Sequence, residues 1–334
     1  MARIEKSRQV KRNHHYVWSY YLKSWAEGND IFYISKKGRI AKDSIKGLAK
    51  ETDFYKINPL NKSDVELIRR FSKFSPPFLQ EEHESQLKHF IQLSNISTFI
   101  NSSGSDSEEL HEIDKVIKHN SLENMHSIYE DLAVEVIASL SRGENTVLND
   151  TQNMIAFCSY LGHQMSRTKS FKEKSKQAIE GNSLLVNDFP NELKLLEKNW
   201  WFISYMLGIN IGLSLYESKD RDRHIFIKNE TGTPFITSDH PIINIHPAVH
   251  KKAVIEAPEY SDFYFPLSPR YAYMINHSNT YNGLERSIDD EAVKKLNRYI
   301  YEKSYENVFS CNSEVLEEMK THNKTIQPTQ EPRG

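Results

Sequence analysis

Two helical segments joined by a short turn constrain this chain more than any other feature of its sequence. Residues 122–140 carry an apolar side chain at every fourth position, a spacing that predicts one buried helix face. The positions concerned are Ile128, Leu132, Val136 and Leu140. Gly143 suits the left-handed cap that ends a helix, and Asn149 or Asp150 suits the start of a second helix that reaches Arg167. Because the connection is short, we expect the two helices to lie antiparallel.

Such an antiparallel pair would bring three polar side chains together. Glu130 lies about as far before the turn as Gln164 and Arg167 lie after it, and Gln164 and Arg167 share a helix face. A carboxylate, an amide and a guanidinium that converge can bind a phosphate or a metal-bound substrate. Glu130 and Arg167 can equally form an interhelical ion pair, which is the simpler interpretation.

The flanking regions have the pattern of strands. Short runs of aromatic and β-branched residues, bounded by turn residues, occur at 30–35, 263–265, 271–275 and 308–310. Residues 225–227 and 234–237, around a turn at 229–232, predict a β-hairpin. The predicted fold is α+β, with a predominantly helical central region packed on a small, mostly antiparallel C-terminal sheet. An N-terminal segment that contains strands completes it.

Changes in composition divide the chain into regions. We expect a basic arm, an N-terminal segment that packs on the rest, a helical region, a sheet-containing region and a disordered tail. Their bounds are 1–12, 13–60, 61–217, 218–320 and 321–334.

Composition excludes several classes of protein. The net charge of -2 argues against an overall basic coat for nucleic acid, although a local patch remains open. The apolar runs fall short of the ~20 residues of a membrane span, and no apolar run follows the basic N-terminus, so we expect a cytoplasmic protein without a membrane partner. Two cysteines are too few for a disulfide framework. P-loop, dinucleotide-binding, H-E-x-x-H and G-x-S-x-G motifs are all missing from the sequence.

Two adjacent histidines precede an aromatic-rich stretch at 16–25. A neutral imidazole can bind a transition metal or act as a general base. Neighbouring residues point in different directions on a strand or a helix, so we do not expect His14 and His15 to serve one metal. The alternative is a pair of surface or internally bonded histidines beside an aromatic cluster.

A second candidate site follows the strand predicted at 234–237. Side chains at the end of a strand are held firmly and can reach a cleft, so Asp239 could ligate a metal or orient a histidine, with Ser238 as a hydrogen-bonding partner. The alternative, which the sequence favours, is a turn whose side chains satisfy nearby backbone groups.

Several short motifs, taken in order, resemble the bacterial family called domain of unknown function 4238. They are His15-Tyr16-Val17, Tyr21-Leu22-Lys23-Ser24-Trp25, Asp53-Phe54-Tyr55, Gln164 with Arg167-Thr168, residues 235–241, Pro266-Leu267-Ser268-Pro269 and Asn297. Trp18 and Lys169 stand where the family usually has proline. The resemblance covers about residues 13–311.

The resemblance implies that polar residues far apart in the sequence form one site, and it favours His15 over His14. The residues assigned to catalysis are His15, Glu130, Arg167 and Asp239. Those assigned to substrate binding are Gln164, Ser238, Asn297, Lys11 and Arg12. Asp239 and Glu130 would hold a divalent metal, Mg²⁺ or Mn²⁺.

We therefore expect a hydrolase, either a nuclease or a nucleotide-cleaving effector, with metal assistance as an option. Proteins of this family resemble the products of accessory genes in bacterial defence islands. That association implies antiphage defence, a nucleic acid or nucleotide target and a partner protein of the defence system. The alternatives are a non-catalytic ligand- or nucleic-acid-binding sensor module, and a purely structural polar network.

Overall fold

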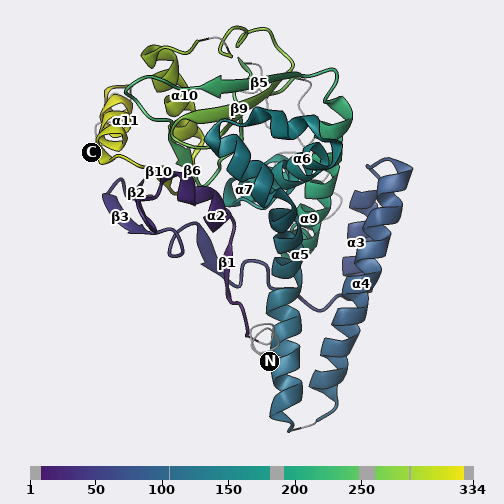
Figure 1. Ribbon diagram of the computed structural model, residues 1–334. Helices are drawn as coiled ribbons and strands as arrows, with labels where there is room; N and C mark the ends of the chain where they lie inside the picture. Colours follow the sequence, from purple (N-terminus) through teal and green to yellow (C-terminus); the bar gives the residue numbers. More distant parts are fainter. Residues whose placement is uncertain (1–8, 105, 181–191, 248–259, 286, 327–334) are drawn as a thin grey trace, which may run out of the picture.

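The computed structural model describes residues 9–104, 106–180, 192–247, 260–285 and 287–326 (Figure 1). It confirms the α+β fold. Long helices occupy the middle of the chain, and all the described strand pairs are antiparallel.

The helical region consists of long helices with short connections. Their bounds are α3 Lys62–Ser72, α4 Pro77–Ser102, α5 Glu108–Arg142, α6 Thr151–Ser166, α7 Lys169–Glu180 and α9 Glu192–Ser218. Helix α4 and the first half of α5 extend from the rest of the molecule as a two-helix arm (Figure 1). Gly143 ends α5 with a φ of +98°, and the short 3₁₀ helix η2, Asn145–Asn149, leads to α6. Asp150 caps α6 by accepting a hydrogen bond from the Asn153 N–H, so the predicted helix pair is confirmed.

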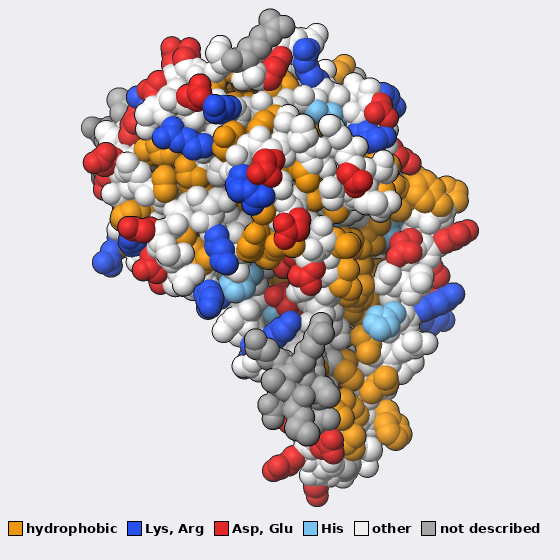
Figure 2. All heavy atoms as spheres, viewed as in Figure 1, with side chains coloured by type: hydrophobic (Ala, Val, Ile, Leu, Met, Phe, Trp, Pro, Cys, Tyr) orange, Lys and Arg blue, Asp and Glu red, His pale blue; other side chains and the backbone are white. Residues whose placement is uncertain are grey.

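The buried face of α5 differs from the predicted one. Val136 and Leu140 are buried, but Ile128 is 57% exposed and Leu132 is 60% exposed. The residues that α5 buries are Asp114, His119, Asn120, Leu122, His126, Ala133, Val136, Ile137 and Leu140. A spacing of strictly four drifts around a helix of 3.6 residues per turn, so the real contact face follows mixed steps of three and four. Exposed hydrophobic side chains therefore remain on the outer surface of the helices (Figure 2).

Helices α6 and α9 cross at unusually close range. A Cβ atom added at Gly162 would lie 2.3 Å from the Gly208 carbonyl oxygen and 2.4 Å from the Gly212 amide nitrogen. A Cβ at Gly208 would lie 2.6 Å from Nδ1 of His163. Only glycine fits these positions, and the close crossing fixes where the C-terminal end of α6 lies.

The strands form one two-stranded and two four-stranded sheets in the described part of the chain. The first pairs β1, Asn13–His15, with β4, Lys50–Thr52. The second has the order β3-β2-β10-β6, with bounds Ile40–Ser44, Asp30–Ile34, Val308–Ser310 and Thr237–Ser238. The third has the order β5-β9-β8-β7, with bounds Arg223–Lys228, Tyr271–Asn276, Asp262–Pro266 and Ile243–Asn244.

The predicted hairpin around residues 229–232 is wrong. Strand β5 pairs with β9, whereas β6 pairs with β10 in a different sheet. The backbone of Asn229 and Phe235 instead bonds to Arg270 and Pro269, at the start of β9. Residues 229–232 do lie between two strands, but they are part of a connection that leads from one sheet to the other.

The N-terminal segment packs on the C-terminal region. Strand β2 lies between β3 and β10, and the short helices α2, Ser19–Leu22, and η1, Lys23–Trp25, follow β1. The Tyr21 hydroxyl donates to the Pro266 carbonyl (2.7 Å), and Trp25 Nε1 donates to the Phe235 carbonyl (2.8 Å). Most of the aromatic-rich stretch at 16–25 therefore belongs to the hydrophobic core.

Two helices close the C-terminal region. Helix α10, Asp290–Lys303, begins at its N-cap Asp289, and α11 spans Ser313–Ile326. Residues 321–326, expected to be disordered, continue α11, and the remainder of the predicted tail lies outside the described residues. Residues 1–8 of the predicted basic arm also lie outside them.

Candidate functional site

Glu130 and Arg167 meet as the antiparallel arrangement predicts. The Arg167 Nη2 atom lies 2.6 Å from Oε1 of Glu130 and donates to Oε1 of Gln164 at 2.8 Å. Arg167 is only 3% exposed. Burial is the largest single cause and lowers the pKa of Arg167, but Glu130 together with Tyr55 and Tyr160 raises the net pKa, so the guanidinium stays charged.

Gln164 ties this pair to the N-terminal segment. Its Nε2 donates to the carbonyl of Tyr16 at 2.9 Å, and its Oε1 accepts the N–H of Trp18 at 3.3 Å. The N-terminal segment therefore closes over the end of α6.

His15 immediately precedes the residues that Gln164 holds. Its Nε2 is buried and has no hydrogen-bond partner among the described residues. Burial lowers the pKa of His15, a bond to the Lys46 backbone opposes this, and the positive charges of Lys50 and Arg167 lower it further. The structure thus places His15, Glu130, Gln164 and Arg167 in one neighbourhood, with His15 as a neutral imidazole.

Glu123 is a residue of this site that sequence reasoning missed. It lies seven residues before Glu130 on α5, so both carboxylates share one helix face. Burial raises the pKa of Glu123 to about 7, Arg167 opposes the rise, and Glu130 adds to it. Oε2 of Glu123 is buried and has no partner in the described part of the chain. The spacing of seven was the available signal in the sequence.

Two further histidines lie buried beside Arg167. The ring of His163 packs against that of Tyr129 with 3.8 Å between the ring centroids, and the rings of His126 and Tyr55 have centroids 4.7 Å apart. No ring nitrogen of His126 or His163 has a hydrogen-bond partner among the residues described. Burial and then the Arg167 charge lower the pKa of His163 to about 3, and the same two causes lower that of His126, so both rings are neutral.

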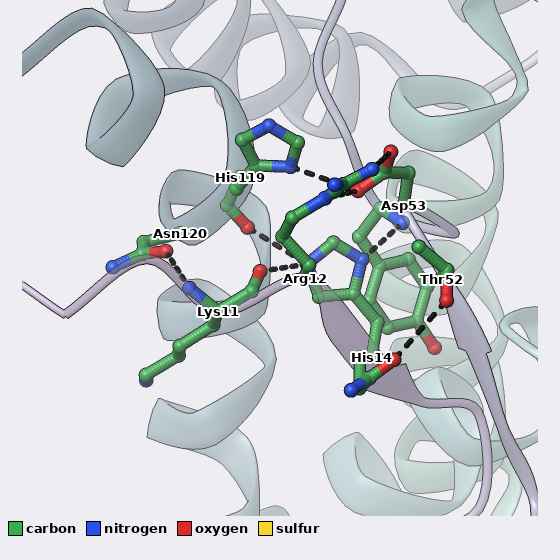
Figure 3. A network of polar contacts seen from close by, with 9 residues as sticks. Lys11, Arg12, His14, Thr52, Asp53, His119 and Asn120 are labelled. Carbon is green, nitrogen blue, oxygen red and sulfur yellow. Dashed lines mark hydrogen bonds and ion pairs between the residues drawn. The ribbon is translucent and has the colours of Figure 1, made fainter. Parts of the chain in front are cut away.

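His14, set aside at the sequence level, is the better anchored of the two adjacent histidines. Its Nδ1 accepts the Tyr55 N–H at 2.8 Å, so the ring proton is on Nε2. That Nε2–H faces the carbonyls of Lys11 (2.8 Å) and His119 (2.9 Å) (Figure 3). His14 is fully buried. Its hydrogen bonds join the backbone of Lys11, of His119 on α5 and of Tyr55.

Lys11 and Arg12, predicted to bind substrate, belong to the same network. The Lys11 side chain donates to Asn124, and its backbone N–H donates to Asn120. Arg12 binds both carboxylate oxygens of Asp53, and Nδ1 of His119 lies 3.1 Å from Oδ1 of that carboxylate (Figure 3). The bond from Arg12 lowers the pKa of Asp53. In this structure both basic side chains therefore have protein partners.

Asp239, Ser238 and Asn297 make a different set of hydrogen bonds from Glu130, Gln164 and Arg167. Asp239 is buried and accepts the backbone N–H groups of residues 305–307 at 2.6 to 3.0 Å. These three bonds lower the pKa of Asp239, but burial outweighs them and raises it to about 6. Ser238 bonds to the backbone of His240, and Asn297 bonds to the backbone of Pro234 and Ile236. All three hold residues 234–240 in place.

The candidate metal ligands therefore contact different parts of the chain. Glu130 pairs with Arg167, whereas Asp239 accepts backbone bonds beyond α10. Among the residues described, no group of three or more His, Cys, Asp or Glu side chains is arranged to hold a metal ion.

Comparison with known proteins supports the predicted family. No curated protein and no solved structure matches the chain. None of the described helices combines the length and the apolar character that a membrane crossing requires. The family model described as "Protein of unknown function (DUF4238)" matches residues 13–314, nearly the whole chain, and the chain therefore belongs to that family.

Proposed function

We propose that this protein hydrolyses phosphodiester or nucleotide bonds at the site between α5 and α6. The observation that carries the proposal is Glu123, whose pKa of about 7 lets the carboxyl group both accept and donate a proton near neutral pH. Perturbed carboxylates beside a buried arginine are typical of reactive sites.

The roles follow from the contacts. Glu123 takes a proton from the attacking water, and the oxygen of this water forms a bond to phosphorus. The bond between phosphorus and the leaving oxygen breaks, and the leaving oxygen takes up a proton from solvent. Arg167 is held by Glu130 and Gln164, and its buried Nε has no partner among the described residues, so this N–H can stabilise the charge that develops on the phosphoryl oxygens. The free Nε2 of His15 adds a second polar contact.

We assign Asp239, Ser238 and Asn297 to positioning, because their polar atoms bond to backbone groups. Glu123 and Glu130 are oxygen donors of the kind that Mg²⁺ or Mn²⁺ prefers, so a divalent cofactor is tested as a separate part of the proposal.

The experiment is a hydrolysis screen with synthetic and natural substrates. Purified protein is incubated with bis-p-nitrophenyl phosphate, single-stranded DNA, RNA and nucleotides, with EDTA, Mg²⁺ or Mn²⁺. We expect Glu123→Gln to reduce any activity at least ~100-fold, because general acid–base groups contribute about that much. Arg167→Lys keeps the charge but loses the planar fork and should also be impaired. Glu135→Gln is the matched control, since Glu135 is exposed on the same helix. Activity that persists in Glu123→Gln contradicts the proposal.

The second candidate is a sensor module that binds a ligand at the same residues without turnover. It is favoured by the full engagement of Arg167 Nη2 by Glu130 and Gln164. Ligand-dependent thermal stabilisation without hydrolysis in any of the conditions above would select this function. The proposed setting is the bacterial cytoplasm, in antiphage defence with a partner protein. It rests on the family resemblance, and a plaque assay with wild type and Glu123→Gln tests it.

A further inference from the structure

Helix α4 carries exposed apolar side chains at both of its ends. Phe78, in its first turn, is 51% exposed, and Phe99, in its last turn, is 70% exposed. Ile96 is also exposed and lies 18 residues after Phe78, which is five full turns of an α-helix, so the two share one side of α4. The opposite side is buried, and Phe90 there packs edge to face on Trp201 of α9. The exposed side of α4 is therefore not needed for the folding of the monomer.

Helix α5 widens this surface at the tip of the two-helix arm. The Ser97 hydroxyl donates to Oδ1 of Asp114 at 2.6 Å, so the neighbouring Ile113 lies at the level of the last turns of α4. Ile113 is itself exposed, and Figure 2 shows hydrophobic side chains along the arm. We call this surface the arm face. It consists of the exposed residues Phe78, Glu81, Glu82, Ser85, Lys88, His89, Gln92, Ile96, Phe99 and Ile113.

The size of the arm face matches that of a protein–protein contact. Helix α4 has 26 residues and is therefore about 39 Å long. Two helices side by side are ~20 Å wide, so the arm presents about 800 Å², whereas α4 alone presents about half of that. A stable interface takes ~800 Å² from each partner. Exposed apolar side chains that are surrounded by polar ones mark interaction sites of this kind.

The order of residues along the arm face identifies the partner. The face is apolar at both ends and polar between them, so it is complementary to a second copy of itself that runs in the opposite direction. Phe78 of one copy then meets the partner's Ile96 and the partner's Phe99. The body of the protein lies at one end of the arm and is wider than the arm (Figure 1). Arms that run in the same direction would make the two bodies collide, whereas antiparallel arms place them at opposite ends.

We propose that the protein forms a twofold-symmetric dimer in which the arm faces of two copies pack antiparallel. Twofold symmetry makes each contact twice, so both apolar ends of each arm are buried. The polar residues between them form the hydrated part of the interface. Lys88 lies nearest to the twofold axis, because its position is midway between Phe78 and Phe99, and its long side chain can extend to water. The dimer does not depend on hydrolysis at Glu123.

Sedimentation equilibrium of the full chain tests the dimer with wild type, Phe78→Asp and Phe99→Asp. Ile155→Asp is the matched control, because Ile155 is an exposed apolar residue of α6, outside the arm. We expect the wild type and the control to be dimers at micromolar concentration. Each phenylalanine change should weaken dimerisation at least ~100-fold, because each of these side chains is buried twice in the dimer. Thermal unfolding at a concentration where the wild type is monomeric should be alike in all four proteins, since the changed residues are exposed in the monomer.

Disulfide crosslinking then tests the direction of the two arms. The changes are made together with Cys311→Ser, because Cys311 is an exposed thiol. Lys88→Cys should form a disulfide between two copies on mild oxidation. Asn95→Cys should not, because seven residues along each helix separate the two thiols by about 20 Å, well beyond the reach of a disulfide.

Three results would overturn the proposal. The first is a wild type that stays monomeric at hundreds of micromolar. The second is a dimer that persists unchanged in both Phe78→Asp and Phe99→Asp, which would place the interface elsewhere. The third is a disulfide that forms as readily in Asn95→Cys as in Lys88→Cys, which would mean that the arms do not run antiparallel.

Discussion

Replacing Glu123 by glutamine should make the protein more stable at pH 8. The pKa of Glu123 is about 7 in the folded chain, against an ordinary value of 4.5. Between these values the folded state binds more protons than the unfolded state, so this residue makes stability fall as the pH rises through that window. One unit of pKa corresponds to about 1.4 kcal/mol, so the cost of the charged carboxylate is about 3 kcal/mol above pH 7.

Urea unfolding followed by circular dichroism measures this effect. Glutamine resembles the protonated carboxyl group, so the two proteins should have similar free energies of unfolding at pH 4. At pH 8 the variant should be more stable by about 3 kcal/mol. The pKa values of His126 and His163 are lowered and give the opposite slope, but they do so in both proteins and cancel in the difference. Glu135→Gln, at an exposed position of α5, should show no such pH-dependent gain.

Two results would refute the reasoning. A Glu123→Gln variant less stable than wild type at pH 8 would mean that the carboxylate has favourable partners. A stability difference that is the same from pH 4 to pH 8 would mean that Glu123 titrates normally. In either case the raised pKa, and with it the proton-transfer role, would have to be abandoned.

Three further changes test the framework around the site by urea unfolding. Gly162→Ala should destabilise by about 3 kcal/mol, because the clash with backbone atoms of α9 exceeds the ~1 kcal/mol gain in helix propensity; a neutral result would contradict the close crossing. His14→Ala should lower the free energy of unfolding by about 3 kcal/mol, since it leaves the buried backbone groups that His14 binds without partners. A loss below ~1 kcal/mol would argue against these hydrogen bonds. Glu130→Gln should cost about 3 to 5 kcal/mol, because it leaves the buried Arg167 charge without its carboxylate. Glu130→Leu with Arg167→Met should recover most of that loss, and equal losses in the two variants would contradict this cause.

Local signals predicted the helices well, because their ends carry capping residues and their connections are short. Gly143 and Asp150 are enough to place α5 against α6, and that placement brings Glu130 to Arg167. Strand pairing was harder to predict. Strand β5 and residues 237–238 are neighbours in sequence, but each is completed by a strand that lies much later in the chain.

The candidate site was partly predictable for a similar reason. Residue type and helix spacing identify Glu130, Gln164 and Arg167, since their contacts run between two adjacent helices. The roles of His14 and Asp239 depend on backbone groups far away in the sequence, which no local pattern reveals. Glu123 resembles any exposed helix glutamate until the packing around it is known.

The contacts of the N-terminal segment affect how the chain folds during synthesis. Residues 13–25 are synthesised before residues 235–310, yet Tyr21 and Trp25 bond to Pro266 and Phe235, and β2 pairs with β10. Such contacts between distant residues form slowly. Until the last strands emerge, this aromatic stretch has no complete core to enter and exposes the surface that chaperones bind. Residues 13–34 can therefore complete their folding only after residues 235–310 have been synthesised.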